Sequence, residues 1–156
     1  MAFKIGIHLT NKDNFDEIMA AGILKAKSPI LSDKLVKLYN NAESANTEKY
    51  IFALPYPLPA GWKGCEFLKI LKKRRNEEIY FLLPQDNCYV MNSRLIYDLT
   101  KNIRNSGKPV KEHANTVYTK FCIDKYLYSK TPLKEYKYNF DLPELIINKS
   151  IKLYEG

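Results

Sequence analysis

Residues 3–22, FKIGIHLTNKDNFDEIMAAG, decide the fold, because a strand-like pattern and a helix-like pattern follow one another there without a gap. Phe3, Ile5 and Ile7 alternate with other residues, which indicates a strand over residues 3–9. The later apolar residues recur one helical turn apart instead, and they are Phe15, Ile18 and Met19. The chain therefore opens with a strand, a short loop and a short helix.

The ends of that helix are also marked in the sequence. Asn14 precedes Glu17 by three residues, the spacing of a capping box, and acidic residues in a first turn favour a helix N-terminus. Gly22 favours a left-handed conformation that stops the helix. We therefore expect Asn14 to begin the helix and Gly22 to end it.

The rest of the chain predicts a mixed α+β fold. Helical spacing indicates further helices over residues 32–40 and 65–75 and after Ser93, with a loop over residues 40–46. Alternating or short apolar runs indicate strands over residues 50–54, 79–83, 89–91, 136–140, 142–147 and 151–154. Residues 117–128 fit either state, and the prolines after residue 54 argue against continued strand pairing. Helices are thus expected mainly early, with strands closing the chain.

Length and composition bound the class of protein. The chain has 156 residues, of which 46% are hydrophobic and 13% aromatic, so a single folded domain over residues 1–156 is expected. No apolar run approaches the roughly 20 residues that span a bilayer, and the N-terminus lacks a signal-peptide core. We expect a soluble, cytoplasmic protein with no membrane partner.

The chain is basic. It has 25 Lys and Arg residues against 17 Asp and Glu residues, a net charge of +8 that favours anionic partners such as nucleic acids. A lysine-rich composition from an AT-rich genome gives the same excess. The densest run, residues 72–75, closes a predicted helix, where cations complement the helix dipole. We interpret it as solvated charge that is dispensable for catalysis, with a nucleic-acid or acidic-protein contact as the alternative.

Metal and common nucleotide motifs are absent from the sequence. Three cysteines at wide spacing give no CxxC pair, and two histidines make a zinc site improbable. There is no GxGxxG, Walker-type, GxSxG or HExxH motif. No metal is expected, and the cysteines are interpreted as reduced thiols.

Two polar residues occupy positions where ligand-binding groups gather. His8 ends the first strand, and Glu144 leads the apolar stretch Leu145-Ile146-Ile147. A carboxylate in that position must be paired, neutralised or directed into a cleft. A structural hydrogen bond for His8 and a water-facing edge position for Glu144 are the alternatives.

These features resemble a family. His8-Leu9-Thr10, followed by Asn14-Phe15-Asp16-Glu17-Ile18 and Gly22-Ile23-Leu24, is similar to the opening of ADP-ribosyltransferase-like proteins of the DarT type and, with changes, of the diphtheria-toxin and poly-ADP-ribose-polymerase branch. Residues 144–151 resemble the closing segment of that family, in which a glutamate begins a strand. Residues 50–54 resemble its middle strand, so the resemblance extends over most of the chain.

The resemblance implies a split, strongly bent sheet with NAD in the cleft between its halves. It implies that Glu144 is the catalytic carboxylate, that His8 binds the adenosine-side ribose, that the Leu9 backbone brackets the nicotinamide amide, and that Thr10 supports the ribose contact. The stacking aromatic is left open between Tyr50, Tyr56 and Trp62. His8 and Glu144 are then expected to face one cleft, and their placement on opposite faces of the sheet would remove this interpretation.

The implied function is an NAD-consuming mono-ADP-ribosyltransferase, a toxin or effector whose acceptor is DNA, RNA or protein and whose partner is an antitoxin or host target protein. Leu142 two positions before Glu144 argues against modification of arginine by a Glu-x-Glu pair. The alternatives are a tRNA 2′-phosphotransferase-like enzyme and a non-catalytic basic binding or inhibitor module. Residues 55–62 are expected to form a rigid aromatic wall beside the nicotinamide, unless Trp62 plugs the core instead.

Overall fold

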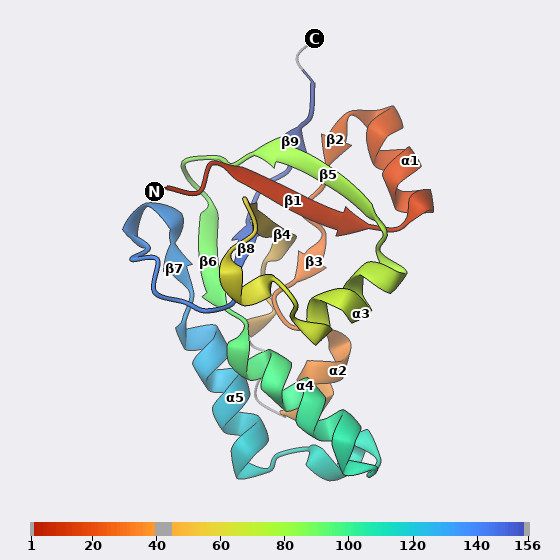
Figure 1. Cartoon of the computed structure of the whole chain (residues 1–156), viewed down its shortest axis with the longest axis vertical. Helices are drawn as coiled ribbons and strands as arrows, with labels where there is room; N and C mark the ends of the chain where they lie inside the picture. The colour runs from red at the N-terminus through yellow and green to blue at the C-terminus, as the bar shows by residue number, and fades with distance from the viewer. Residues whose placement is uncertain (1, 40–44, 155–156) are drawn as a thin grey trace.

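The computed structural model describes residues 2–39 and 45–154. Helices and short strands alternate along this part of the chain (Figure 1). The α-helices are α1 (Lys12–Ala21), α2 (Asp33–Leu38), α3 (Glu66–Arg74), α4 (Arg94–Ser106) and α5 (Val117–Tyr128). The strands are β1 (Ile5–Thr10), β2 (Ile23–Leu24), β3 (Ser28–Pro29), β4 (Lys49–Tyr56), β5 (Glu77–Leu82), β6 (Cys88–Asn92), β7 (Thr131–Pro132), β8 (Pro143–Ile147) and β9 (Ile151–Lys152). None of these helices is long and apolar enough to cross a membrane.

One open sheet organises the molecule. Its seven strands lie in the order β5-β1-β4-β8-β6-β7, with β3 beside β4, and β2 pairs separately with β9. Every pairing within the described residues is antiparallel. The α+β class expected from the sequence is therefore confirmed.

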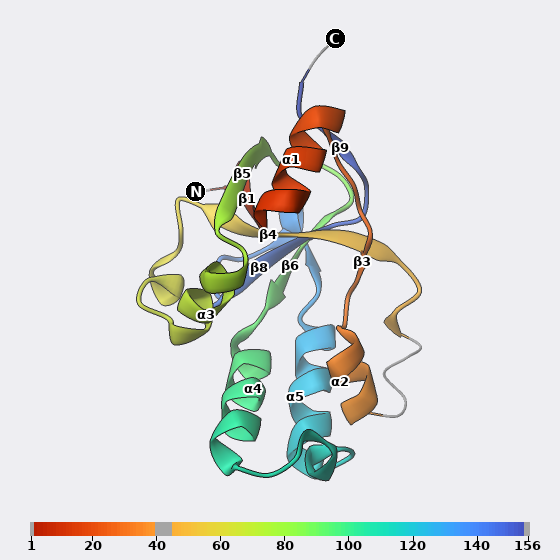
Figure 2. The ribbon, with the colours of Figure 1, turned by 90° about the vertical axis from the view of Figure 1, so that its right-hand side faces the viewer.

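Side-chain alternation along the central strands divides the core between the two faces of the sheet. On β8, Ile146 packs with residues of α4 and α5, whereas Leu145 and Ile147 pack with the opposite core cluster. The α4–α5 pair extends from one end of the sheet and α1 lies near the other end (Figure 2). The strands in the middle, β4 and β8, therefore contribute side chains to both cores.

Pairing between β1 and β4 is short. Only Ile5, Gly6 and Ile7 of β1 have partners on β4, ending at the pair Ile7 and Leu54. On its other side β1 pairs with β5 along its whole length, to Thr10. Beyond Ile7 the sheet therefore opens between β1 and β4, and His8, Leu9 and Thr10 border that opening.

The first helix begins earlier than the capping-box spacing predicts. Asn11 is its N-cap, and the Asn11 side chain accepts a hydrogen bond of 2.8 Å from the backbone N–H of Asn14. Asn11 is therefore the N-cap residue, and Asn14 supplies the backbone N–H that is capped. Gly22 ends the helix at a φ of 70°, in the left-handed region, as predicted.

The expectation that proline ends the pairing after residue 54 is wrong. β4 continues to Tyr56, with Pro55 opposite Gly6 of β1. The pairing of β4 with β8 runs over Ile51, Phe52 and Ala53 only, so Pro55 lies beyond the β8 ladder and its missing N–H breaks no bond there.

Four further interpretations of the sequence can be compared with the structure. Residues 117–128, left open from sequence, form α5. Residues 136–140 form no strand, because Tyr136, Tyr138 and Phe140 pack ring against ring instead. Helices are not concentrated early, since α4 and α5 lie in the second half, and the predicted loop over residues 40–46 falls mostly outside the described residues.

Candidate functional site

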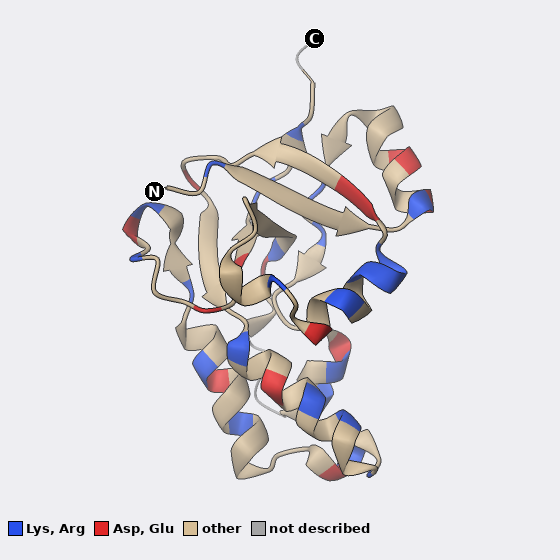
Figure 3. Cartoon of the chain, in the orientation of Figure 1, with Lys and Arg blue, Asp and Glu red and all other residues tan. Residues whose placement is uncertain are grey.

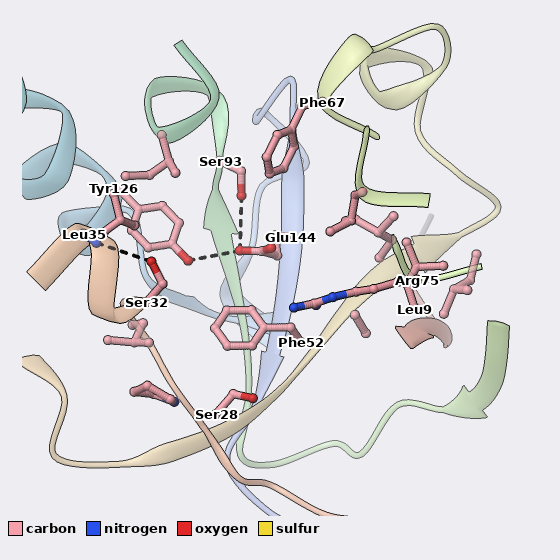
Figure 4. A pocket seen from close by; sticks show the side chains of 17 residues that line it. Leu9, Ser28, Ser32, Leu35, Phe52, Phe67, Arg75, Ser93, Tyr126 and Glu144 are labelled. Atoms are coloured by element: carbon pink, nitrogen blue, oxygen red, sulfur yellow. Dashed lines mark hydrogen bonds between the residues drawn. The ribbon is translucent and has the colours of Figure 1, made fainter. Parts of the chain in front are cut away.

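Glu144 lies near the start of β8, between β4 and β6, and its side chain enters a pocket (Figure 4). Its Oε1 atom accepts one hydrogen bond of 3.2 Å from the Ser93 hydroxyl and another of 3.0 Å from the Tyr126 hydroxyl. Within the described residues, Oε2 has no hydrogen-bond partner. The carboxylate is thus held through one oxygen, and the other is available to a ligand.

The Ser93 hydroxyl is diverted from the helix cap to the carboxylate. Ser93 is the N-cap of α4, yet its side chain makes no capping hydrogen bond. The side chain of Asn92 accepts a hydrogen bond of 3.2 Å from the Arg94 N–H instead. The beginning of α4 therefore serves to position Glu144.

The pocket around Glu144 is mainly apolar and has a volume of about 380 Å³. Phe52 of β4, Phe67 of α3 and Tyr126 of α5 contribute its aromatic walls. Its apolar lining is completed by Ile7, Leu9, Pro29, Ile30, Leu35, Ala53, Leu54, Leu71 and Ile96. These walls present flat apolar faces, and Glu144 is the only carboxylate among the lining residues that the structure describes.

Burial raises the pKa of Glu144, because a carboxylate surrounded by protein loses hydration. Hydrogen bonds from Tyr126 and Ser93, and the positive charge of Arg75, oppose that rise. Burial also raises the pKa of Tyr126, so this phenol keeps its proton and donates a hydrogen bond to Glu144. The three neighbours thus limit the rise in the pKa of Glu144 without cancelling it.

His8 bridges the opening in the sheet. Its Nδ1 atom lies 2.8 Å from the backbone oxygen of Phe52 on β4, and since a carbonyl only accepts, Nδ1 carries the proton. Burial lowers the pKa of His8, and the nearby charges of Arg75 and Lys27 lower it further. The imidazole is therefore neutral near pH 7, with Nε2 as a hydrogen-bond acceptor.

His8 lines a second pocket, of about 360 Å³, on the side of β1 that faces α1. This pocket is more polar than the first, and its polar lining residues are His8, Thr10, Asn11, Asn14, Glu17, Lys25, Lys27, Ser28, Tyr50 and Arg75. Leu9, Ser28 and Arg75 line both pockets, so the two adjoin.

The structure does not bring His8 and Glu144 into one pocket, and the expectation of a single cleft is wrong. Ile7 pairs with Leu54, and the β4–β8 register places Glu144 next to Leu54 on the same face. Because successive residues of a strand point to opposite faces, His8 points away from that face. The two side chains therefore lie on opposite faces of the sheet, in which β4 is between β1 and β8, although their pockets share three lining residues.

The predicted aromatic wall is not formed by residues 55–62. The Trp62 side chain is only 1% exposed, packs among Leu68 and Leu142, and donates a hydrogen bond of 2.8 Å from Nε1 to the Pro143 backbone oxygen. It lines neither pocket, so the alternative of a core plug is the one that the structure favours.

Tyr56 also lies away from both pockets. It is 45% exposed and packs edge-on against Tyr80 of β5, with ring centroids 5.3 Å apart. Of the three predicted aromatics, only Tyr50 lines a pocket, that of His8. Its hydroxyl donates to Glu48 at 2.9 Å and accepts from Lys130 at 2.8 Å.

Four residues of the site were missed from the sequence. Phe52 could have been identified from the sequence, since it shares a face of a predicted strand with Tyr50. Arg75 was interpreted as part of a solvated charge run, and only the structure shows it at both pockets. Ser93 and Tyr126 reach Glu144 from two helices, and no local sequence signal indicates such long-range contacts.

The described residues contain no group of three or more His, Cys, Asp or Glu side chains that could hold a metal ion. Cys88 and Cys122 are buried, Cys65 is half-buried, and none of the three forms a disulfide. The chain matches no family model, and it matches neither a curated protein nor a solved structure.

Proposed function

We propose that this chain is an NAD-dependent mono-ADP-ribosyltransferase in which Glu144 is the catalytic carboxylate. One observation carries the proposal. Glu144 is held through Oε1 by Ser93 and Tyr126, while Oε2 has no hydrogen-bond partner among the described residues, in a pocket of about 380 Å³. A fixed carboxylate with one available oxygen can accept a hydrogen bond from a ribose hydroxyl of NAD.

The reaction explains why a carboxylate in an apolar pocket is useful. The bond between nicotinamide and C1′ of the ribose breaks, the electron pair leaves with nicotinamide, and positive charge develops on the ribose. The acceptor atom then bonds to C1′ and loses its proton. Oε2 of Glu144, hydrogen-bonded to the ribose 2′-hydroxyl, stabilises the developing charge most in the transition state.

In this proposal the aromatic walls of the Glu144 pocket bind nicotinamide, the leaving group. Phe52, Phe67 and Tyr126 surround the Glu144 pocket and present flat apolar faces to a planar ring. In this proposal they take the part that the sequence analysis assigned to Tyr56 and Trp62.

Two adjoining pockets suit a ligand with two halves. The nicotinamide half of NAD occupies the Glu144 pocket, and the adenosine half extends past Leu9 towards His8, whose Nε2 can accept a hydrogen bond from a ribose hydroxyl. The short β1–β4 pairing supports the split sheet that the resemblance implies. The opposite faces of His8 and Glu144 remove the interpretation in which these two residues act as a pair on one ribose. The present proposal therefore rests on Glu144 and its pocket and takes no support from the resemblance at His8.

A tRNA 2′-phosphotransferase-like activity is the second candidate. It requires cations around the site for a phosphorylated RNA end, and Lys25, Lys27 and Arg75 line the His8 pocket. The apolar Glu144 pocket, with its free carboxylate oxygen, favours ADP-ribosyl transfer over this alternative.

The test is to incubate the protein with NAD that carries radioactive phosphorus in its adenylate phosphate. Separate pools of protein, DNA and RNA are offered as acceptors, and released nicotinamide is measured by chromatography. We expect nicotinamide release and label in one pool. RNA with a 2′-phosphate end is a further arm, in which loss of that phosphate indicates the second candidate.

Glu144→Gln is the decisive variant, because it keeps the shape and the acceptor for Ser93 and Tyr126 but removes the charge. We expect nicotinamide release to fall about 10²- to 10³-fold, as for loss of one preorganised electrostatic contact of about 2.7–4 kcal/mol. NAD binding should be largely retained. Binding of NAD without nicotinamide release by the wild type would indicate a non-catalytic module and overturn the proposal.

A further inference from the structure

Arg75 has an unusual position for a residue at the end of a basic run. It is the C-cap of α3, with φ −128° and ψ 74°, so the backbone leaves the helical course at this residue. Lys72, Lys73 and Arg74 remain on the helix, where Figure 3 shows the basic residues of α3. The change of direction separates the Arg75 side chain from the rest of the run.

That side chain is directed into the site. Figure 4 shows Arg75 extending between Leu9 and Phe52 into the Glu144 pocket. The same residue lines the His8 pocket. Arg75 therefore stands where the two pockets meet, and its charge acts on both His8 and Glu144.

Among the described residues, the cations at the junction form no ion pair, although the charge of Arg75 acts on Glu144 in the same pocket. In the described part of the chain, no carboxylate lies within 4 Å of the side-chain nitrogens of Arg75 or Lys27. Ser28, which also lines both pockets, adds a hydroxyl group. Glu17, on α1, is the one acidic residue that lines the His8 pocket.

We propose that Arg75, together with Lys27 and Ser28, binds phosphate groups of a nucleotide at the junction of the two pockets. A guanidinium group presents several donors in a plane and pairs with phosphate oxygens in bidentate fashion. Lys27 adds a second positive charge and Ser28 a neutral donor. The inference rests on the proposed function in assigning these phosphates to the pyrophosphate of NAD, which joins the two halves of that molecule.

This assignment changes the role given to residues 72–75. The sequence analysis interpreted the whole run as dispensable solvated charge. Arg74 and Arg75 are both exposed, but Arg75 lines the two pockets and Arg74 lines neither. Arg74 is therefore a matched control for Arg75, with the same chemistry and the same change in net charge.

The test measures binding by calorimetry, so it does not depend on turnover. ADP, adenosine and adenosine 2′-monophosphate are titrated into the wild type, Arg75→Gln, Arg74→Gln and Lys27→Gln. We expect ADP to bind the wild type at least about tenfold more tightly than adenosine. Arg75→Gln should remove most of that advantage, about 10- to 100-fold for lost charge-assisted hydrogen bonds. Lys27→Gln should have a smaller effect and Arg74→Gln almost none.

Each outcome separates the phosphate site from the proposed activity. Equal weakening by Arg74→Gln and Arg75→Gln, or equal binding of ADP and adenosine by the wild type, would overturn the phosphate site. ADP binding that depends on Arg75, in a protein that releases no nicotinamide from NAD, would support the site and overturn the transferase. Preference for adenosine 2′-monophosphate over ADP would support the site with an RNA end as its source. Thermal melting of each variant shows that it is folded.

Discussion

The two adjoining pockets differ in chemistry although they share a strand. The Glu144 pocket is lined mainly by apolar side chains around one carboxylate, whereas the His8 pocket is polar and contains several cations. The division follows from alternation along β1, which directs Ile7 to one pocket and His8 and Thr10 to the other, while Leu9 lines both. A strand whose pairing is interrupted can thus build two different environments a residue apart.

Burial has opposite consequences for the two titratable groups. It raises the pKa of Glu144 and lowers the pKa of His8, because in each case the charged form loses hydration. Glu144 has hydrogen-bond donors and Arg75 to offset that loss. His8 has one backbone acceptor, Phe52, while both nearby cations add to the lowering. Both shifts therefore favour the neutral form, but protein donors and a cation oppose this at Glu144, whereas the two cations add to it at His8.

The largest expected effect is a loss of stability when Trp62, which contacts the start of β8, is truncated. Trp62 is buried and its indole N–H donates to the backbone of Pro143, the residue before Glu144. We expect Trp62→Ala to lower the free energy of unfolding by about 3–5 kcal/mol, as for other buried aromatic truncations. Chemical denaturation followed by circular dichroism measures this loss.

Tyr56→Ala is the control from the same proline-rich segment. Tyr56 is 45% exposed and outside both pockets, so Tyr56→Ala should change the free energy of unfolding by less than about 1 kcal/mol. If Trp62→Ala were instead stable and specifically defective in NAD binding, Trp62 would be a cofactor wall after all and the placement described above would be wrong.

The next effect concerns the hydrogen bonds that hold the carboxylate. Tyr126→Phe removes one donor from Oε1 of Glu144, a contact to a charged group worth about 1.5–3 kcal/mol. Because that hydrogen bond lowers the pKa of Glu144, its loss should raise this pKa further. The acid limb of the pH profile of nicotinamide release should move to higher pH, with lower activity at neutral pH.

Tyr128→Phe provides the matched comparison on the same helix. The Tyr128 side chain is 88% exposed and lines neither pocket. The pH profile of nicotinamide release by Tyr128→Phe should therefore match that of the wild type. A Tyr126→Phe variant with an unshifted acid limb would show that Glu144 is not the group titrating in the profile.

Local patterns predicted the framework of this molecule better than its site. Alternation identified the strand that became β1, and helical spacing with Gly22 identified α1, because both signals lie within a few residues. The cap was misplaced by one turn, since Asn11 and Asn14 both suit an N-cap and only the folded chain selects between them. Residues 117–128 were ambiguous because α5 is apolar on its exposed side too, as at Val117 and Phe121.

The site depends on contacts that no local pattern contains. Glu144 was identified because a carboxylate within an apolar strand requires a partner, but its partners are on α4 and α5, 51 and 18 residues away. The separation of His8 from Glu144 depends on the register of three strands, and a shift of one residue would reverse it. The sequence indicated which residue types could form the site, but it did not indicate the strand register that sets their faces.

The smallest expected effect, and the most direct comparison of the pockets, is on the pH dependence of stability. The folded pKa of Glu144 is raised, so its contribution to stability is present below the unfolded value and lost as pH rises through the folded pKa. The folded pKa of His8 is lowered, so its contribution is present above its ordinary value of 6.5 and lost as pH falls through the folded pKa. Glu144→Gln should therefore raise the melting temperature at neutral pH relative to acid pH, and His8→Gln should flatten the decline below pH 6.5. Melting curves of both variants and the wild type between about pH 4 and pH 8 measure the two slopes, within the range where both groups titrate. Changes of the same sign in the two variants would show that the pockets do not impose opposite electrostatic conditions on their titratable groups.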